Sequence, residues 1–143
     1  MTAAEAWAAV VEGEDAAVFA YSVAGARVGA SARAKALNGL DAHRAHRGRA
    51  SALVTAAGGT PPTPAVAYDL PFEVTSRATA RALMALVDNR LVGLYADAAE
   101  QASGDDRRWA ARSAAENATR AVTWGAEPQA FPGVPGLWSA DAD

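Results

Sequence analysis

The stretch GGTPPTPAVAYDLPFEVT at residues 58–75 decides how this chain folds. Its four prolines exclude a helix and favour an extended path. Neighbouring helices of a bundle are usually joined by about 2–8 residues, so these 18 residues exceed what a turn needs. Fully extended they reach roughly 59 Å, which is more than the roughly 39 Å of a helix of about 26 residues. We therefore predict a crossover that runs the length of a helical bundle, pinned to it by Tyr68, Leu70 and Phe72.

Two helices are predicted before the crossover. Thr2 and Glu5 have the spacing of a capping box, which starts a helix near the N-terminus. Apolar and small residues then recur at spacings of three and four to about Val28, as on one face of a helix. After a short break, with Ser31 as the expected cap, a second helix continues to the glycine pair that opens the crossover. So short a break makes the two helices antiparallel neighbours.

Two more helices are predicted after the crossover. The third spans about residues 76–102, and Ser103 with Asp106 has the form of a capping box that opens the fourth. Prolines end the helical pattern in the tail, at about residues 126–143, whose apolar residues are expected to dock on the bundle. The expected inner face of the third helix consists of Leu83, Val87, Leu91, Leu94 and Ala98, with Tyr95 at its flank.

The composition supports one all-α domain over residues 1–143. Forty residues are Ala, which has the highest helix propensity and permits close helix packing. Cysteine is absent, which excludes thiol nucleophiles and Cys-ligated metals. The formal net charge of −3 argues against nucleic acid as the main partner. The start of the chain lacks a signal-peptide pattern and no long apolar window follows, so we expect a cytoplasmic protein without a membrane span.

Four stretches carry a resemblance to a known family. They are EDAAVFAYSVAGAR at 14–27, AHRAHR at 42–47, TPPTPAVAYDLPFEVT at 60–75 and RAVTWGAEPQAFPGVPGL at 120–137. Together the chain resembles an alanine-rich family of bacterial proteins of unknown function with a ferritin-like four-helix bundle fold. The resemblance implies a closed bundle that associates into a dimer, and it implies no established activity.

Ferritin-like bundles that hold two metal ions offer a template for the interior. They use one Glu from each of two helices and a Glu-x-x-His pair from each of the other two. The first helix offers Glu14, and the second has His43-x-x-His46 in place of Glu-x-x-His. Asp88 on the third helix lies about 95° from its inner stripe, and Glu116 on the fourth has no His three residues later. We therefore predict that the dinuclear metal site is absent.

Arginines are candidates to balance the buried carboxylates instead. Arg47 lies one turn from His43, and Arg120 follows Glu116 at the spacing that lets two side chains of a helix meet. The predicted polar core network comprises Glu14, His43, Arg47, Glu116 and Arg120, without a metal cofactor. The alternative is an iron or manganese site made by Glu14, His43, His46, Asp88 and Glu116.

These features favour a non-enzymatic bundle that acts through protein association, as a homodimer. The alternative function is that of a metal-binding protein or metal-dependent oxidoreductase of the same superfamily. The two differ in what the interior must contain, because an enzyme needs several ligands converging on one metal position. The recurring aromatic residues, which include Tyr21, Tyr95 and Trp124, are expected in the core or at subunit contacts.

Overall fold

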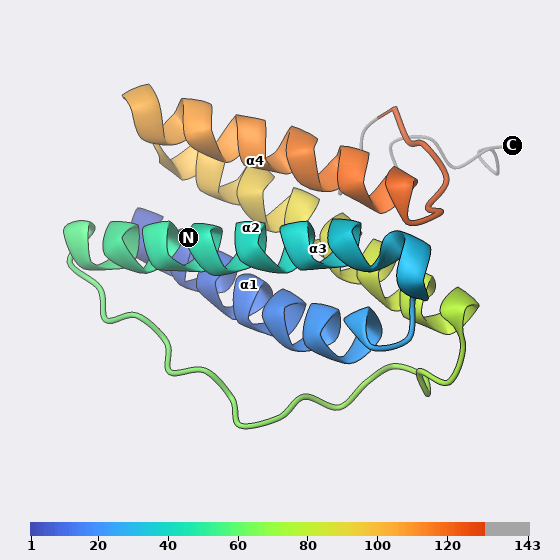
Figure 1. Ribbon diagram of the computed structural model, residues 1–143. Coiled ribbons are helices and arrows are strands. Elements are labelled where there is room, and N and C mark those ends of the chain that lie inside the picture. The colour runs from blue at the N-terminus through green and yellow to red at the C-terminus, as the bar shows by residue number, and fades with distance from the viewer. Residues whose placement is uncertain (131–143) are drawn as a thin grey trace, which may run out of the picture.

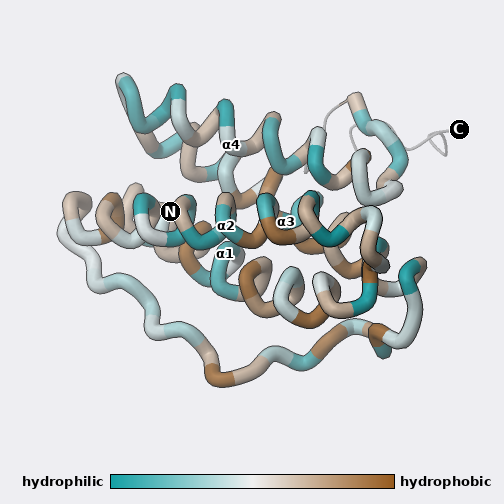
Figure 2. The backbone as a smooth tube through the Cα atoms, viewed as in Figure 1, coloured by the Kyte–Doolittle hydropathy of each residue, from teal (hydrophilic) through white to brown (hydrophobic). Residues whose placement is uncertain are grey.

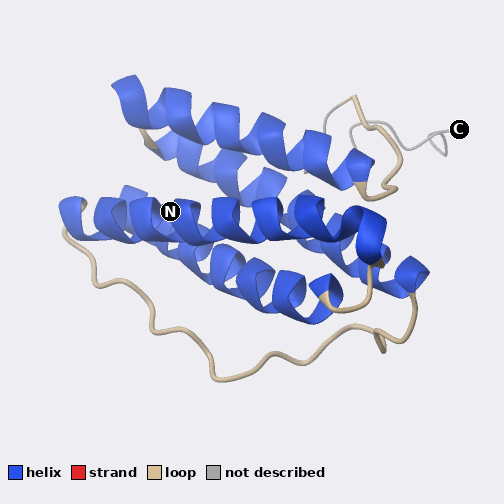
Figure 3. Cartoon of the chain, in the orientation of Figure 1, coloured by secondary structure: helices blue, strands red, loops and turns tan. Residues whose placement is uncertain are grey.

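Four helices form a bundle in the computed structural model, which describes residues 1–130 (Figure 1). No strand occurs within that range (Figure 3). The helices are α1 (Ala3–Gly25), α2 (Ala30–Ala56), α3 (Arg77–Gln101) and α4 (Gly104–Thr123). The predicted all-α four-helix bundle with a long crossover is confirmed. Most of the predicted tail docking concerns residues 131–143 and lies outside the described residues.

The crossover runs from the end of α2 to the start of α3 along the outside of the bundle (Figure 1). The ring of Tyr68 lies 5.5 Å from that of Phe19 on α1, and Leu70 packs against the core. Phe72 does not pin the crossover as predicted, since it is exposed. The chain bends at Phe72, and Val74 packs against the core two residues later.

The helix starts agree with the sequence in part. The capping box of Thr2 and Glu5 forms as predicted, through bonds of 3.2 and 2.7 Å. Ser103 precedes α4 but makes no capping hydrogen bond, so the box predicted there is wrong. The predicted cap Ser31 lies inside α2, whose N-cap is Gly29. Gly29 has a φ of 85°, and this left-handed conformation allows the sharp turn from α1 into α2.

The helices pack along three seams and leave the fourth open. α1 packs against α2 and α3, and α3 packs against α4. Between α2 and α4, by contrast, the described chain makes no close backbone contact. Figure 2 shows that α4 is largely hydrophilic along its length. The α2–α4 seam is therefore the side of the bundle at which polar side chains can reach the interior.

Two apolar clusters fill the two ends of the interior. One is built around Trp7, Val11 and Leu91, and the other around Leu40 and Leu83. The helical positions between these clusters carry buried polar side chains, namely Glu14, Asp15, His43, Asp88, Ser113 and Asn117. Because buried polar groups are costly unless they are hydrogen-bonded, this middle layer is where a function of the bundle is expected.

Candidate functional site

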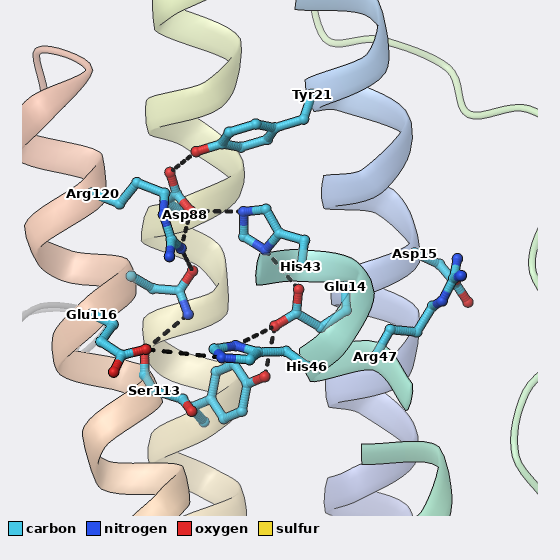
Figure 4. Close-up of polar contacts among 12 residues, drawn as sticks. Glu14, Asp15, Tyr21, His43, His46, Arg47, Asp88, Ser113, Glu116 and Arg120 are labelled. Atoms are coloured by element: carbon cyan, nitrogen blue, oxygen red, sulfur yellow. Dashed lines mark hydrogen bonds and ion pairs between the residues drawn. The ribbon is translucent and has the colours of Figure 1, made fainter. Parts of the chain in front are cut away.

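His43 on α2 stands at the centre of the buried polar layer (Figure 4). Its Nδ1 lies 2.7 Å from Oε2 of Glu14 on α1, and its Nε2 lies 3.2 Å from Oδ1 of Asp88 on α3. The first contact is a hydrogen bond, whereas the second is an ion-pair contact without hydrogen-bond alignment. All three side chains are fully buried. One imidazole thus joins two carboxylates from two other helices.

Two tyrosines complete the hydrogen bonding of these carboxylates. The hydroxyl of Tyr21 donates to Oδ2 of Asp88 at 2.6 Å, and that of Tyr95 donates to Oε1 of Glu14 at 2.6 Å. Trp124 Nε1 donates in turn to the Tyr21 oxygen at 2.8 Å. Each carboxylate is therefore held between the imidazole and a phenol, and the bonds tie α1 to α3 and α4.

A second histidine and an arginine approach the network from the α2–α4 seam. His46 Nδ1 lies 3.5 Å from Oε1 of Glu14, and its Nε2 lies 3.8 Å from Oε2 of Glu116. Nη1 of Arg120 lies 3.4 Å from Oδ1 of Asp88 and donates to Oδ1 of Asn117 at 3.2 Å. The guanidinium therefore gives Asp88 a positive neighbour besides His43.

The network has an internal two-fold pattern. Glu14 and Tyr21 on α1 are matched on α3 by Asp88 and Tyr95, each 74 residues later (88 − 14 and 95 − 21). The same offset relates the pairs His43 and Asn117, and His46 and Arg120, on α2 and α4. The two tyrosine–carboxylate hydrogen bonds also correspond to each other. In each bond, the tyrosine of one helix donates to the carboxylate of the other helix. The bundle thus consists of two helix pairs that place corresponding residues around one centre.

The surroundings favour a charged imidazole beside charged carboxylates. Burial lowers the pKa of His43, but its contacts with Asp88 and Glu14, and the charges of both, outweigh burial and raise this pKa overall. Burial raises the pKa of Glu14, but hydrogen bonds from His43, His46 and Tyr95 together with the His43 charge lower it overall.

The tyrosines serve as donors in this network. Burial is the largest cause that raises the pKa of Tyr21, and the neighbouring Asp88 raises it further. Burial likewise raises the pKa of Tyr95 most, and the neighbouring Glu14 adds to this effect. Both phenols therefore keep their protons at neutral pH. With two carboxylates, one imidazolium and the Arg120 guanidinium, the charges of the centre balance.

The predicted residue Glu116 does not lie in the core, because 48% of its side chain is exposed. The inward positions of α4 are instead Ser113, Asn117 and Ala121. The inward position is Asn117, one residue later than the predicted Glu116, and one residue corresponds to about 100° around a helix. On α4 the inner Glu-x-x-His positions of the metal template are therefore filled by Asn117 and Arg120 rather than by Glu116 and Thr119.

Arg47 also lies outside the network. Its Nη1 donates to Oδ1 of Asp15 at 3.0 Å, which is a separate, partly buried ion pair. Arg120 does reach the centre, but its carboxylate partner is Asp88 rather than the predicted Glu116. Of the predicted network, the structure thus brings together Glu14, His43 and Arg120.

Asp88 and the two tyrosines contribute more to the site than the helical pattern alone predicts. Asp88 was expected at the edge of the inner stripe of α3 but is fully buried. Tyr21 and Tyr95 were expected as core aromatics, and their hydroxyls prove to be the donors to the two carboxylates. A signal was present in the sequence, because an acidic residue precedes a tyrosine by seven positions on both α1 and α3.

The residues present do not fit a dinuclear metal centre. Both ring nitrogens of His43 face carboxylates, and a guanidinium lies beside Asp88 where a metal would need open ligand oxygens. Within residues 1–130, no three His, Asp or Glu side chains are arranged to hold a metal ion.

None of the helices that the structure describes combines the length and the apolar composition that a membrane-spanning helix needs.

Comparisons with known proteins place the chain in a family. The model of a family described as a domain of unknown function (DUF4439) matches residues 6–136. The fold is similar to the crystal structure of a conserved hypothetical protein from Mycobacterium tuberculosis, with 27% identity and a TM-score of 0.81 over 85% of this chain and 94% of that chain. No curated protein matches. The chain belongs to the DUF4439 family, whose function is unknown.

Proposed function

We propose that this protein is a degenerate member of the ferritin-like superfamily. In this proposal a buried hydrogen-bonded network replaces the dinuclear metal centre, and the bundle acts through protein association rather than catalysis. The observation that carries the proposal is the set of residues at the six template positions. These are Glu14, His43-x-x-His46, Asp88 and Asn117-x-x-Arg120, in helix order.

The substitutions at these positions preserve the charge balance of a metal centre by other means. The template has four carboxylates around two cations, whereas this chain keeps only Glu14 and Asp88. The cations are then supplied by His43 and Arg120, which lie 2.7 to 3.4 Å from carboxylate oxygens. A buried carboxylate without such a partner would be strongly destabilising or would be neutralised. The network therefore supports a structural role for the centre.

The surface supports association in a more limited way. A few large apolar side chains are exposed, among them Leu37 on α2, Val66 on the crossover and Val122 on α4. Exposed apolar side chains are the surface feature that a protein contact would bury. We propose a homodimer as the associated state.

Metal analysis and a mass in solution, measured on protein purified without a His tag, test the two parts of this proposal. We expect iron, manganese and zinc well below one equivalent per chain, and a mass twice that of the 14.6 kDa chain. Stoichiometric iron or manganese that is lost in a His46→Ala variant would instead support the metal-binding alternative. A monomer at micromolar concentration would contradict the dimer.

A further inference from the structure

The open seam between α2 and α4 forms a groove of about 530 Å³ directly above the buried network. Its lining includes Lys35 and Gly39 from α2, and Arg112, Ala115 and Arg120 from α4. The groove is open to solvent, so an occupant lies along the surface between the two helices. Because Arg120 also contacts Asp88, the floor of this groove is connected to the polar centre.

The charge of the groove is positive although the chain as a whole is acidic. Three cationic side chains line it, and Glu116 is the single carboxylate among its lining residues. Lys35 and Arg112 form no ion pair with any described residue. Although Lys35 also lies 5.9 Å from the centre of the Trp124 ring, cations without a carboxylate partner on the two facing walls of a groove favour an anionic occupant.

Arg120 is positioned to serve both the centre and the groove. Only 19% of its side chain is exposed, and Nη1 alone makes its contacts with Asp88 and Asn117. Within the described chain, its other guanidinium nitrogens make no hydrogen bond. A guanidinium held in place along one edge presents its remaining donors in a fixed planar fork, which suits a carboxylate or a phosphate.

Gly39 lines the groove on the α2 side. Its lack of a side chain makes room for the buried Tyr21 ring, because a Cβ there would come within 2.4 Å of Cε1 of Tyr21. Ala115 on the facing helix is also small. A ligand therefore meets small residues between the charged side chains, which leaves room for an uncharged body next to an anionic head group.

We propose that this groove binds a small organic anion with a carboxylate or phosphate head group. The head group accepts hydrogen bonds from the outward nitrogens of Arg120, and Arg112 and Lys35 add attraction at the rim. The uncharged body lies against Ala115. This inference goes beyond the proposed association, which requires no ligand.

Titrations of the full chain with phenyl phosphate and with benzoate, followed by backbone amide NMR shifts, test the proposal. We expect saturable shifts confined to α2 and α4 around the groove, and none with the cation benzylamine. Comparing the two anions distinguishes a phosphate from a carboxylate preference. Because the attraction is electrostatic, added salt should weaken the binding.

Exposed variants provide the control. Arg112→Gln and Lys35→Gln should each weaken binding about two- to fivefold, which is the effect of losing one exposed ionic contact. Arg90→Gln makes the same charge change on an exposed residue of α3 away from the groove, and should leave the affinity unchanged. The proposal is overturned if neither anion shifts the groove amides at millimolar concentration. It is equally overturned if all three variants weaken binding alike.

Discussion

Glu14 on α1 and Asp88 on α3 hold the two ring nitrogens of His43 between them, at 2.7 and 3.2 Å. Each carboxylate also accepts a hydrogen bond from a tyrosine of the opposite helix, Tyr95 or Tyr21. The centre of the bundle therefore works as one unit in which three helices share a single imidazole. Loss of any member leaves at least one buried polar group with one partner fewer.

Replacing His43 by Gln should be strongly destabilising. The change removes the positive charge between two buried carboxylates, and breaking a buried ion pair on one side typically costs about 3–5 kcal/mol. Urea unfolding at neutral pH measures this loss. Arg44→Gln removes an exposed cation from the next position of α2 and should change the free energy of unfolding by less than about 1 kcal/mol. Equal effects of the two changes would argue against the network.

Stability should decline on both sides of a plateau in pH. The pKa of His43 is raised above its ordinary value of 6.5, so its contribution is complete below that pH and is lost as the pH rises through the native pKa. The pKa of Glu14 is lowered from 4.5, so its contribution is complete above that pH and is lost as the pH falls through the native pKa. We expect the greatest free energy of unfolding between these two values.

The pH profile has its own control. His43→Gln should flatten the alkaline decline, because the group that titrates there is gone. Urea unfolding of both proteins over the same pH series makes the comparison. An alkaline decline that is unchanged in the variant would mean that another group causes it.

The two tyrosine hydroxyls should differ in their contribution to stability. Tyr95→Phe removes one donor from Glu14, which costs about 1–3 kcal/mol for a buried group left unsatisfied. Tyr21→Phe should cost more, since it also removes the acceptor of Trp124 Nε1. Thermal unfolding gives the order, with Tyr68→Phe in the crossover as the control that changes little. The reverse order would contradict the contacts of Tyr21.

Two glycines of α2 should respond to alanine in opposite ways. Gly39→Ala places a Cβ 2.4 Å from Cε1 of Tyr21, and such overpacking costs about 1–3 kcal/mol. Gly48→Ala meets nothing within 4 Å and should stabilise the helix by about 0.5–1 kcal/mol. Denaturation midpoints of the two variants test both signs. A neutral Gly39→Ala would show that Tyr21 has room to move.

The sequence was sufficient to predict the bundle because its signals are local. Prolines, the Thr2 cap and apolar spacing each act within a few residues, so the helices and the crossover follow from them. Which side chains reach the centre depends on the rotation of each helix about its own axis. On α4 the inward position was predicted one residue too early, at Glu116 instead of Asn117. Partners such as Asp88 and Arg120 lie 32 residues apart and meet only through the packing of two helices.

For Arg47, the helical spacing was predicted correctly but the partner was not. Its spacing from His43 is correct for one face of α2, yet helical spacing does not determine which neighbouring helix a long side chain reaches. The partner that it finds is Asp15, one residue beyond the central Glu14. A helical pattern thus predicted where polar residues gather but not which of them bond.

The protonation of the His43 ring tests most directly whether an ion pair has taken the place of a metal. Imidazole nitrogen NMR on protein with labelled histidine, at neutral pH and during a titration with Zn²⁺, measures it. We expect protons on both ring nitrogens of His43 and signals that do not change as Zn²⁺ is added. A neutral ring with one bare nitrogen whose signal shifts at one equivalent of Zn²⁺ would contradict the proposed replacement.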